Sequence, residues 1–432
     1  MKRFGQGQTG VLVSALLTVV FALGIGEAAE KVKIAYWRVS HPIEGAAAKT
    51  LAKSFMEKYP NIEVDVQMFP VAEYEQKIRT AIAGGVAPDM IAIDGPTIAA
   101  YAYQGAIIPL DDYYTKESRE DILDATLREI VWRGKIWAGP LQQASNAIWY
   151  NKAMFDQEGI TPPRDVDKAW TWAEFLEAAK RMTKRKPDGS VEVWGLKLAL
   201  GFSEWAAYSE MPWLWQNGAD ILSPDGTKSD GFLNSPAAVE ALTFWQDLFI
   251  KHKVAPQSPV VTGSVVSQEP LAVGQAAMII AGTAPQAFYQ QKFPNFQYGV
   301  TPLPRNKAQV TPCGSWHMAI TAQSKHPKEA WSFVDWVTGK AGTKYWYETT
   351  RYLPTRKSVY DSHADLGEYP IKIFSEQTKR FCKPRPVTPA YPVVSDAIIQ
   401  TFQDAAFGKD PKTSLDLAVR TIDRELRKYP VK

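Results

Sequence analysis

The segment at residues 204–220 is rich in aromatic side chains, with Trp205, Tyr208, Trp213 and Trp215 in its first dozen positions. The whole chain holds 15 tryptophans. Aromatic rings serve either as large core side chains or as flat faces for a ligand. On a helix Trp213 and Trp215 point about 200° apart, so both cannot face one ligand. The sequence alone leaves open which of the four rings bind and which pack.

Further candidates come at the carboxyl ends of two predicted strands, VKIAYW and DMIAID. Trp37 ends the first strand, Arg38 and His41 come directly after it, and Asp94 ends the second. Ligands of parallel sheets bind beyond the carboxyl ends of strands, so these side chains are candidates for ligand contact. Packing is the alternative for Trp37 and Arg38. Asp94 can accept hydrogen bonds from ligand hydroxyls or cap the helix that begins near Thr97.

Common sequence patterns of catalysis and metal binding are absent. The five histidines are scattered, and none belongs to an H-E-x-x-H motif or to a cluster with cysteine. Neither G-x-S-x-G nor a phosphate-binding P-loop occurs. A formal net charge of +3 at pH 7 gives no electrostatic case for nucleic acid or an anionic membrane. We therefore expect no catalytic residue, metal or other cofactor.

The elements that position these residues alternate between strands and helices. Strand, helix, strand, helix and strand are predicted in turn at 32–37, 46–59, 62–69, 74–83 and 89–94. This order is typical of the α/β class, with a parallel sheet between helices. Later helices are predicted at 171–183, from 235, at 327–337, 395–407 and 415–427, and later strands at 191–199, 276–280, 298–304 and 316–321.

The first 29 residues have the features of a secretory signal peptide. Lys2 and Arg3 precede an apolar run from Val11 to Leu23, and small residues lead to Ala29. The run is shorter than the roughly 20 residues of a membrane-spanning helix, so a membrane anchor is the weaker alternative. No cysteine lies nearby, which argues against a lipid anchor. About 400 residues would remain, a length typical of two domains.

Two cysteines occur, Cys313 and Cys382. Export to an oxidising compartment would allow them to form a disulfide. The sequence does not show whether they approach each other, so this pairing stays open.

Segments in the order of one known family run through most of the chain. The set resembles the family 1 extracellular solute-binding proteins of ABC importers, the maltose-binding-protein-like group. Each motif is weak alone, but together they cover about 31–356. With their first residue numbers they are FMEKYPNIEV (55), AGGVAPDMI (83), GAIIPLDD (105), GKIWAGP (134), YNKAMF (150) with GITPP (159), TWAEF (171), VGQAAMIIAG (273), YGVTPLP (298) and AWSFVDW (330).

This resemblance implies a two-lobe periplasmic binding protein fold, type II-like, with lobes joined by hinge segments and a ligand cleft between them. It also implies a monomer that captures a sugar, a neutral oligosaccharide, and delivers it to the permease of an ABC importer in the periplasm. The segments expected are a signal peptide at 1–29, the N-lobe at 30–141 and 301–340, and the C-lobe at 142–300 and 341–432.

By the same resemblance, the stretch 204–220 contains the cleft helix of the C-lobe, which carries the aromatic residue that stacks on sugar. Tyr208 is the first choice by position, with Trp205 one turn earlier and Trp213 as a further candidate. Pyranose rings have apolar faces and polar edges, which suits aromatic rings beside hydrogen-bonding side chains. Gln142 and Gln143 fall beside the first crossing between lobes, where an amide both donates and accepts.

Later cleft positions depart from the family pattern. Gly282 and Thr283 match a family G-x-W position, but this chain reads AGTAPQ and lacks the tryptophan. Trp316 is an alternative source of an aromatic face, with packing as its other role. Arg351 resembles the late cleft loop of the family, where it would bind hydroxyls or a carboxylate; a surface ion pair is the alternative.

Other functions remain open at this point. An anionic sugar or a polyol phosphate would need a cationic cleft, for which Arg38 and Arg351 are candidates. A secreted carbohydrate-active enzyme would need two carboxylates about 5 to 9 Å apart. The adjacent pair Asp111 and Asp112 would diverge on a regular element, so this pair does not favour the enzyme.

Overall fold

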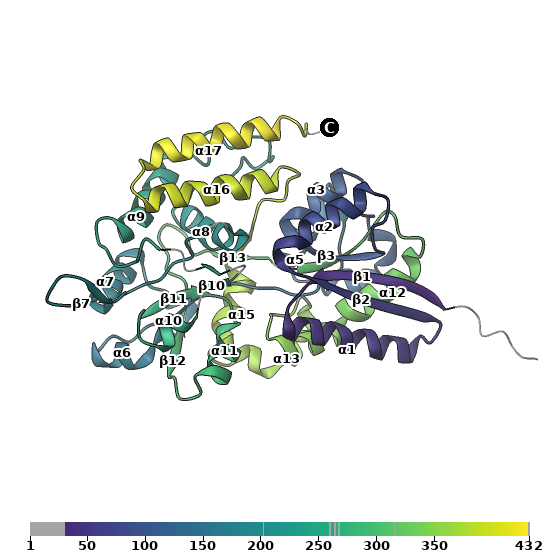
Figure 1. Ribbon diagram of the computed structural model, residues 1–432, viewed down its shortest axis with the longest axis horizontal. Coiled ribbons are helices and arrows are strands. Elements are labelled where there is room, and N and C mark those ends of the chain that lie inside the picture. Colours follow the sequence, from purple (N-terminus) through teal and green to yellow (C-terminus); the bar gives the residue numbers. More distant parts are fainter. Residues whose placement is uncertain are drawn as a thin grey trace, which may run out of the picture.

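The computed structural model describes residues 31–201, 203–258, 261–262, 265–266, 268–314 and 316–430. The predicted signal peptide at 1–29 lies outside these residues. Among the helices of the described ranges, none has both the length and the apolar character needed to pass through a membrane. Figure 1 shows two halves side by side, the first containing the N-terminal strands and the second containing the last two long helices.

A four-stranded sheet in the order β14-β3-β1-β2 forms the centre of the first half. β1 pairs in parallel with β2 and β3, as the alternation of strands and helices predicts. β14 comes from much later in the chain and runs antiparallel to β3, so that Trp316 lies opposite Asp94. The strands are β1 (Val32–Val39), β2 (Ile62–Phe69), β3 (Met90–Asp94) and β14 (Trp316–Ile320).

Helices pack on this sheet around one apolar core, in which the Phe55 and Phe333 rings lie 5.2 Å apart. α1 begins four residues before the predicted start because His41 caps it: the His41 Nδ1 accepts from the Glu44 N–H at 3.4 Å. The helices of this half are α1 (Pro42–Lys58), α2 (Val71–Ala83), α3 (Ile98–Tyr103), α4 (Lys116–Glu120), α5 (Asp124–Ile130), α12 (Pro327–Thr338) and α13 (Lys340–Thr350).

An antiparallel sheet, β11-β6-β12, forms the centre of the second half. Because side chains alternate along a strand, Ile148 and Tyr150 enter one core while Ala147 and Trp149 enter another on the opposite face. Its strands are β6 (Ala147–Asn151), β11 (Met278–Ala281) and β12 (Tyr298–Thr301), and its helices are α6 (Lys152–Gln157), α7 (Trp172–Met182), α8 (Glu204–Gln216), α9 (Pro236–Phe249), α10 (Glu269–Ala272), α11 (Pro285–Lys292), α15 (Ile371–Arg380), α16 (Tyr391–Ala406) and α17 (Pro411–Leu426).

Local sequence signals account for several of these boundaries. The predicted capping box opens α7, where Thr171 and Glu174 bond each other's backbone N–H groups. The strand predicted at 191–199 is wrong in length, since β8 ends at Val193. Beyond it Gly195 passes so close to the α7 backbone that a Cβ would lie 2.0 Å from the Ala179 carbonyl oxygen. The backbone there contacts a helix, and strand pairing is reduced to isolated bridges.

Several chain segments cross between the halves. Residues 139–143 form bridges to Met318 and Leu353, which lie far along the chain. The pairing left open by the sequence is formed: Cys313 and Cys382 make a disulfide with Cα atoms 5.3 Å apart, linking β13 to β15. The remaining short elements are β4 (Val131–Trp132), β5 (Lys135–Ile136), β7 (Lys184–Arg185), β8 (Val191–Val193), β9 (Val261–Thr262), β10 (Val265–Val266), β13 (Thr311–Cys313), β15 (Cys382–Pro384) and α14 (Lys357–Ser362).

Candidate functional site

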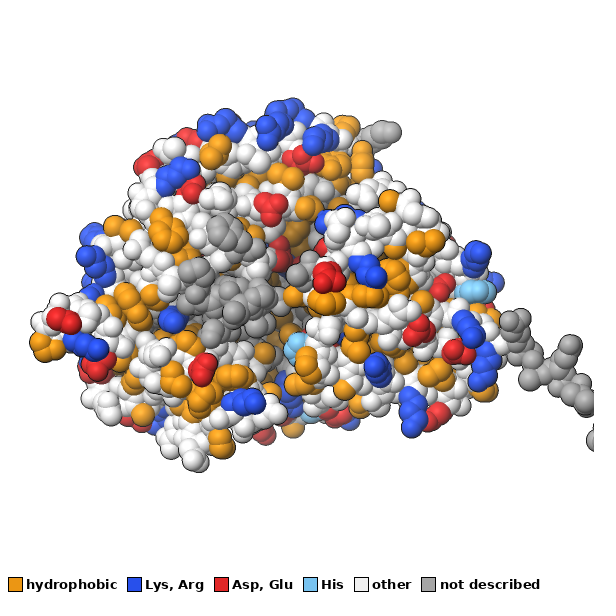
Figure 2. All heavy atoms as spheres, viewed as in Figure 1, with side chains coloured by type: hydrophobic (Ala, Val, Ile, Leu, Met, Phe, Trp, Pro, Cys, Tyr) orange, Lys and Arg blue, Asp and Glu red, His pale blue; other side chains and the backbone are white. Residues whose placement is uncertain are grey.

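The molecular surface is hollowed between the two halves (Figure 2). At this cleft the carboxyl end of β3 in the first half faces the first turn of α8 in the second. Arg385, directly after β15, connects them: its Nη1 and Nη2 donate to both Asp94 carboxylate oxygens at 2.8 and 2.6 Å. Nη1 also donates to Glu204 at 2.6 Å. We call Arg385 with Asp94 and Glu204 the Arg385 bridge.

Aromatic rings flank the Arg385 guanidinium. Its central carbon lies 5.2 Å from the centre of the Tyr208 ring and 5.8 Å from that of Tyr391. Trp205, one turn before Tyr208 on α8, packs against the Tyr208 ring with centroids 5.4 Å apart. The two contacts of the Arg385 guanidinium are of the cation–π type. The face of Tyr208 is therefore occupied by a side chain of the same protein.

Glu204 is held by several partners at the start of α8. It accepts hydrogen bonds from the Tyr391 and Ser395 hydroxyl groups, both on α16, in addition to its contact with Arg385. Partial removal from water raises the pKa of the Glu204 carboxyl group, and the positive charge of Arg385 opposes that increase. The site thus depends on α16, which follows the last segment with family motifs.

Behind the Arg385 bridge lies a buried polar group made of Glu129, Gln143 and His317. Gln143 donates to Glu129 at 2.6 Å, and the His317 Nε2 lies 3.2 Å from the other Glu129 oxygen. Gly314 has φ 129°, and a Cβ there would lie 3.1 Å from the Arg385 Nη2 and 3.2 Å from a Glu129 oxygen. Because Gly314 has no side chain, both groups fit beside its Cα atom. The guanidinium itself contacts two carboxyl groups, those of Asp94 and Glu204.

Arg38 lies in a separate buried network. Its Nη2 contacts the Glu44 carboxylate at 2.5 Å, and its guanidinium lies 5.0 Å from the centre of the Trp346 ring. The Trp346 indole donates to the Gln142 side-chain oxygen at 2.7 Å. Arg38 and Gln142 are thus brought together, as components of the packing between β1, α1, α13 and the crossing at 139–143.

Trp37 and Trp316, both half-buried, pack near α2. Trp37 contacts Phe69, with ring centroids 5.0 Å apart, and Trp316 contacts Tyr74 at 5.8 Å. Trp316 is the closer of the two candidates to the Arg385 bridge because it pairs with Asp94 across β14 and β3.

Three further candidates cluster at a different place. The Thr283 hydroxyl donates to the Arg351 carbonyl at 2.9 Å, and the Gly282 carbonyl accepts from the Trp149 indole at 2.9 Å. The Arg351 guanidinium contacts Asp365 at 2.9 Å. This is the ion pair that the sequence allowed as the alternative for Arg351.

Trp213 differs from the other aromatic candidates because it lies in the apolar core. It is 2% exposed and packs against the rings of Trp172, Phe175 and Phe244. Its position five residues after Tyr208 turns it to the opposite side of α8. We therefore correct its assignment as a ligand residue. His41 acts as the cap of α1, as described above.

Sequence reasoning missed most of the groups around Tyr208. Arg385, Tyr391 and Ser395 lie in the segment without family motifs, and Glu129 and His317 belong to no recognised pattern. One available signal was the position of Arg385 three residues after Cys382, since a disulfide to Cys313 brings it near β14. Another was Glu204, which begins the aromatic helix.

Comparisons with known proteins agree with this architecture. A family model described as bacterial extracellular solute-binding protein matches residues 40–344. The erythritol/L-threitol-binding protein of Mycolicibacterium smegmatis is 28% identical over 349 residues, covering 74% of this chain and 70% of that protein. The galactooligosaccharide-binding protein of Bacillus subtilis is 25% identical over 390 residues, covering 87% and 86%.

Among solved structures, an ABC substrate-binding protein from Listeria monocytogenes in complex with cycloalternan has a TM-score of 0.78 at 25% identity. The match covers 92% of this chain and 100% of that one. The predicted α/β fold of two lobes is confirmed.

Proposed function

Because this chain belongs to the bacterial extracellular solute-binding protein family, we propose that it captures a neutral sugar, an oligosaccharide, and delivers it to the permease of an ABC importer. The sugar would bind in the cleft between the halves, on the faces of Tyr208 and Trp205. The Asp94 and Glu204 carboxylates would accept hydrogen bonds from its hydroxyl groups. Closure of the lobes about a hinge would then remove water from these hydrogen bonds.

The Arg385 bridge beside Tyr208 is the observation that carries this proposal. A sugar hydroxyl both donates and accepts, so it can replace a contact of the guanidinium or of either carboxylate without changing the net charge. An aromatic face next to such groups matches a ring with an apolar face and a polar edge. The ligand can shift the open–closed equilibrium only through its different affinities for the two forms.

Anionic sugars and polyol phosphates are the second candidate class, and the charges oppose them. Arg38 is paired with Glu44, and Arg351 with Asp365. At the Arg385 bridge an anion would meet the carboxyl groups of Asp94 and Glu204, and like charges repel strongly at low dielectric. One relative, the erythritol/L-threitol-binding protein, is named for small uncharged polyols.

Catalysis is the third candidate. Asp94 and Glu204 both face the cleft, as glycoside hydrolysis would require, but both are held by the same arginine. A general acid or nucleophile needs a carboxyl group that is free to reach the substrate. We propose that neither acts on a glycosidic bond and that the sugar leaves the protein unchanged.

We further propose how the chain is divided and where it works. The first half, with 31–141 and β14, would form the N-lobe, and α13 would move with it because Trp346 lies in its core. The second half would form the C-lobe. Residues 1–29 would be removed during export to the periplasm, leaving a monomer without a lipid anchor.

The test uses the purified protein without residues 1–29. Tryptophan fluorescence and melting temperature are recorded against neutral oligosaccharides, polyols, uronates and polyol phosphates. A ligand at 100 times its Kd stabilises the protein by roughly 2.7 kcal/mol, which is readily measured as a melting shift. Binding of neutral sugars without release of reducing ends supports the proposal. Selective binding of phosphates or uronates, or consumption of the sugar, would refute it.

A further inference from the structure

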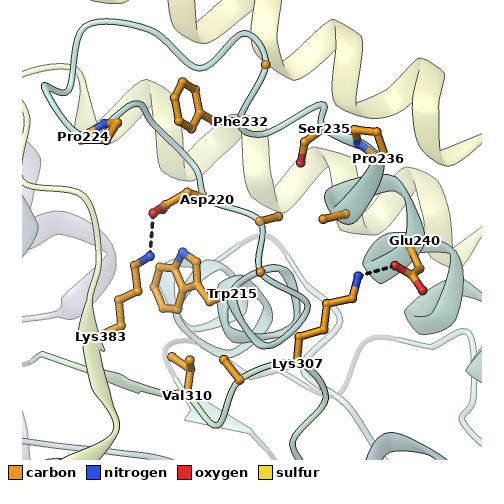
Figure 3. Close-up of a pocket in the computed structure, with 15 residues that line it drawn as sticks. Trp215, Asp220, Pro224, Phe232, Ser235, Pro236, Glu240, Lys307, Val310 and Lys383 are labelled. Carbon is orange, nitrogen blue, oxygen red and sulfur yellow. Dashed lines mark hydrogen bonds and ion pairs between the residues drawn. The ribbon is translucent and has the colours of Figure 1, made fainter.

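A second pocket, of about 840 Å³, lies in the second half at the opposite end of α8 from the Arg385 bridge. The end of α8, the start of α9 and the loop between these helices surround it, together with residues near 307–310 and 383 (Figure 3). Its volume falls within the range of about 300 to 1,000 Å³ that is usual for ligand pockets.

The charged residues at the rim are paired. Lys383 contacts Asp220 at 2.7 Å and Lys307 contacts Glu240 at 2.8 Å. Figure 3 shows these pairs on opposite sides of the pocket, with Trp215 between them. Because each cation has a carboxylate partner, the rim carries no net charge. It offers both donors and acceptors to a neutral ligand.

Trp215 supplies a donor that the protein leaves unused. The side chain is 3% exposed, and its indole Nε1 has no hydrogen-bond partner among the described residues. Figure 3 shows this nitrogen on the edge of the ring that faces Asp220 and the pocket. Buried donors are nearly always paired in native proteins, so an unpaired one beside a pocket points to an acceptor supplied by a ligand.

The pocket repeats the arrangement found in the cleft. Lys383 lies over the Trp215 ring at 5.2 Å, as Arg385 lies over Tyr208 at 5.2 Å. Tyr208 and Trp215 are seven residues apart, which places them on the same face of α8 about 10 Å apart along its axis. In the cleft and in the pocket alike, an aromatic ring of α8 lies beside a cationic side chain, and that cation forms an ion pair with a carboxylate.

We propose that this pocket is a second saccharide site, separate from the cleft, that takes one ring of a neutral sugar. A hydroxyl or ring oxygen of the sugar accepts a hydrogen bond from the Trp215 Nε1. The half-buried Phe232 ring, on the far wall in Figure 3, packs on its apolar face. The ligand class rests on the proposed function, while the site itself rests on the pocket and on Trp215.

The experiment follows the tryptophan indole N–H signals of the ¹⁵N-labelled protein by NMR, with maltose and lactose as probes. Trp215→Phe identifies the Trp215 signal by its loss. The same approach with Trp205→Phe identifies a reporter of the cleft. We expect a titratable shift of the Trp215 signal, because its proton gains an acceptor. Trp245, buried in the core of the same half, serves as the unmoved reference.

Variants separate a direct effect from a transmitted one. Phe232→Ala should weaken the affinity read at Trp215 about two- to twelvefold, as expected for loss of an aromatic contact. Phe293→Ala, at another half-buried phenylalanine beside a different pocket, should leave it unchanged. Tyr208→Leu should weaken the response at Trp205 but leave that at Trp215.

Each remaining outcome is decisive. A fixed Trp215 signal with a moving Trp205 signal refutes the second site and leaves the proposed function standing. If both signals stay fixed with every sugar of the panel, both proposals fail. If Tyr208→Leu abolishes the Trp215 shift, the shift is transmitted from the cleft and the second site is refuted.

Discussion

Replacing Arg385 with glutamine would test whether the Arg385 bridge is a buried structural connection between the halves. The Arg385 side chain is 4% exposed and that of Asp94 is 14% exposed. Removing one partner of a buried ion pair leaves the other charge uncompensated, which lowers the free energy of unfolding by about 3–5 kcal/mol. Glu204 is 38% exposed, so solvent screens its charge and we add nothing for it.

Arg380→Gln provides the matched control in the same region of the chain. Arg380 also contacts both oxygens of one carboxylate, that of Asp167, at 3.1 and 2.5 Å. Here, however, the two side chains are 43% and 60% exposed. An exposed pair contributes only about 0–1 kcal/mol, so this variant should unfold almost like the parent. The two arginines differ mainly in burial, which is the quantity under test.

The assay is chemical unfolding of both variants at neutral pH, together with Asp94→Asn and the double variant Arg385→Gln with Asp94→Asn. Because the double variant leaves no lone Asp94 charge, its loss of stability should be smaller than the sum of the single losses by at least about 1 kcal/mol. The reasoning is refuted if Arg385→Gln costs no more than Arg380→Gln, or if the single losses simply add.

The remaining predictions concern the ligand face, a buried acid and the disulfide. Tyr208→Leu should weaken sugar binding in the cleft about two- to twelvefold in a fluorescence titration, because it removes the aromatic face. Burial raises the pKa of Glu210 well above its ordinary value. The stability that this group contributes is therefore complete below about pH 4.5, the ordinary carboxyl pKa, and is lost as the pH rises. The Glu210→Gln variant has no such loss, so its free energy of unfolding should increase relative to that of the parent as the pH rises. Unfolding measurements over a series of pH values check this. Replacing Cys313 and Cys382 with serine opens a link across a sequence separation of 69 and should cost about 4 kcal/mol, measured under the same conditions with and without reductant.

Much of the fold follows from local signals in the sequence. The alternation of strands and helices before residue 94 predicts the parallel pairing of β1 with β2 and β3, because short crossovers through helices require it. The capping box at Thr171 marks the start of α7 to the residue. β14 could not be placed in this way, since its pairing with β3 joins residues more than two hundred positions apart. No local pattern encodes such a contact.

The candidate site was predictable only where a family motif or a strand end marked it. Tyr208 and Asp94 were expected to face the cleft, and the structure joins them through a residue that no motif marks. Arg38 at a strand end was expected to face the ligand. It instead forms an ion pair with Glu44, in the first turn of α1. The partners of a long side chain are set by the tertiary structure, so its role cannot be predicted from its position along a strand.

β15, the strand after α15, places one cation at the cleft and another at the pocket at the end of α8. Lys383 and Arg385 are two residues apart, so on extended backbone they point to the same side, toward α8. The Cys313–Cys382 disulfide holds this strand beside β13, which itself leads into β14 and the Asp94 end of the cleft. The backbone positions of both cations are thereby fixed relative to the rings below them. A sugar that stacked on the face of Tyr208 under Arg385 would have to displace the Arg385 side chain, and its affinity would then reflect the exchange of one set of hydrogen bonds for another.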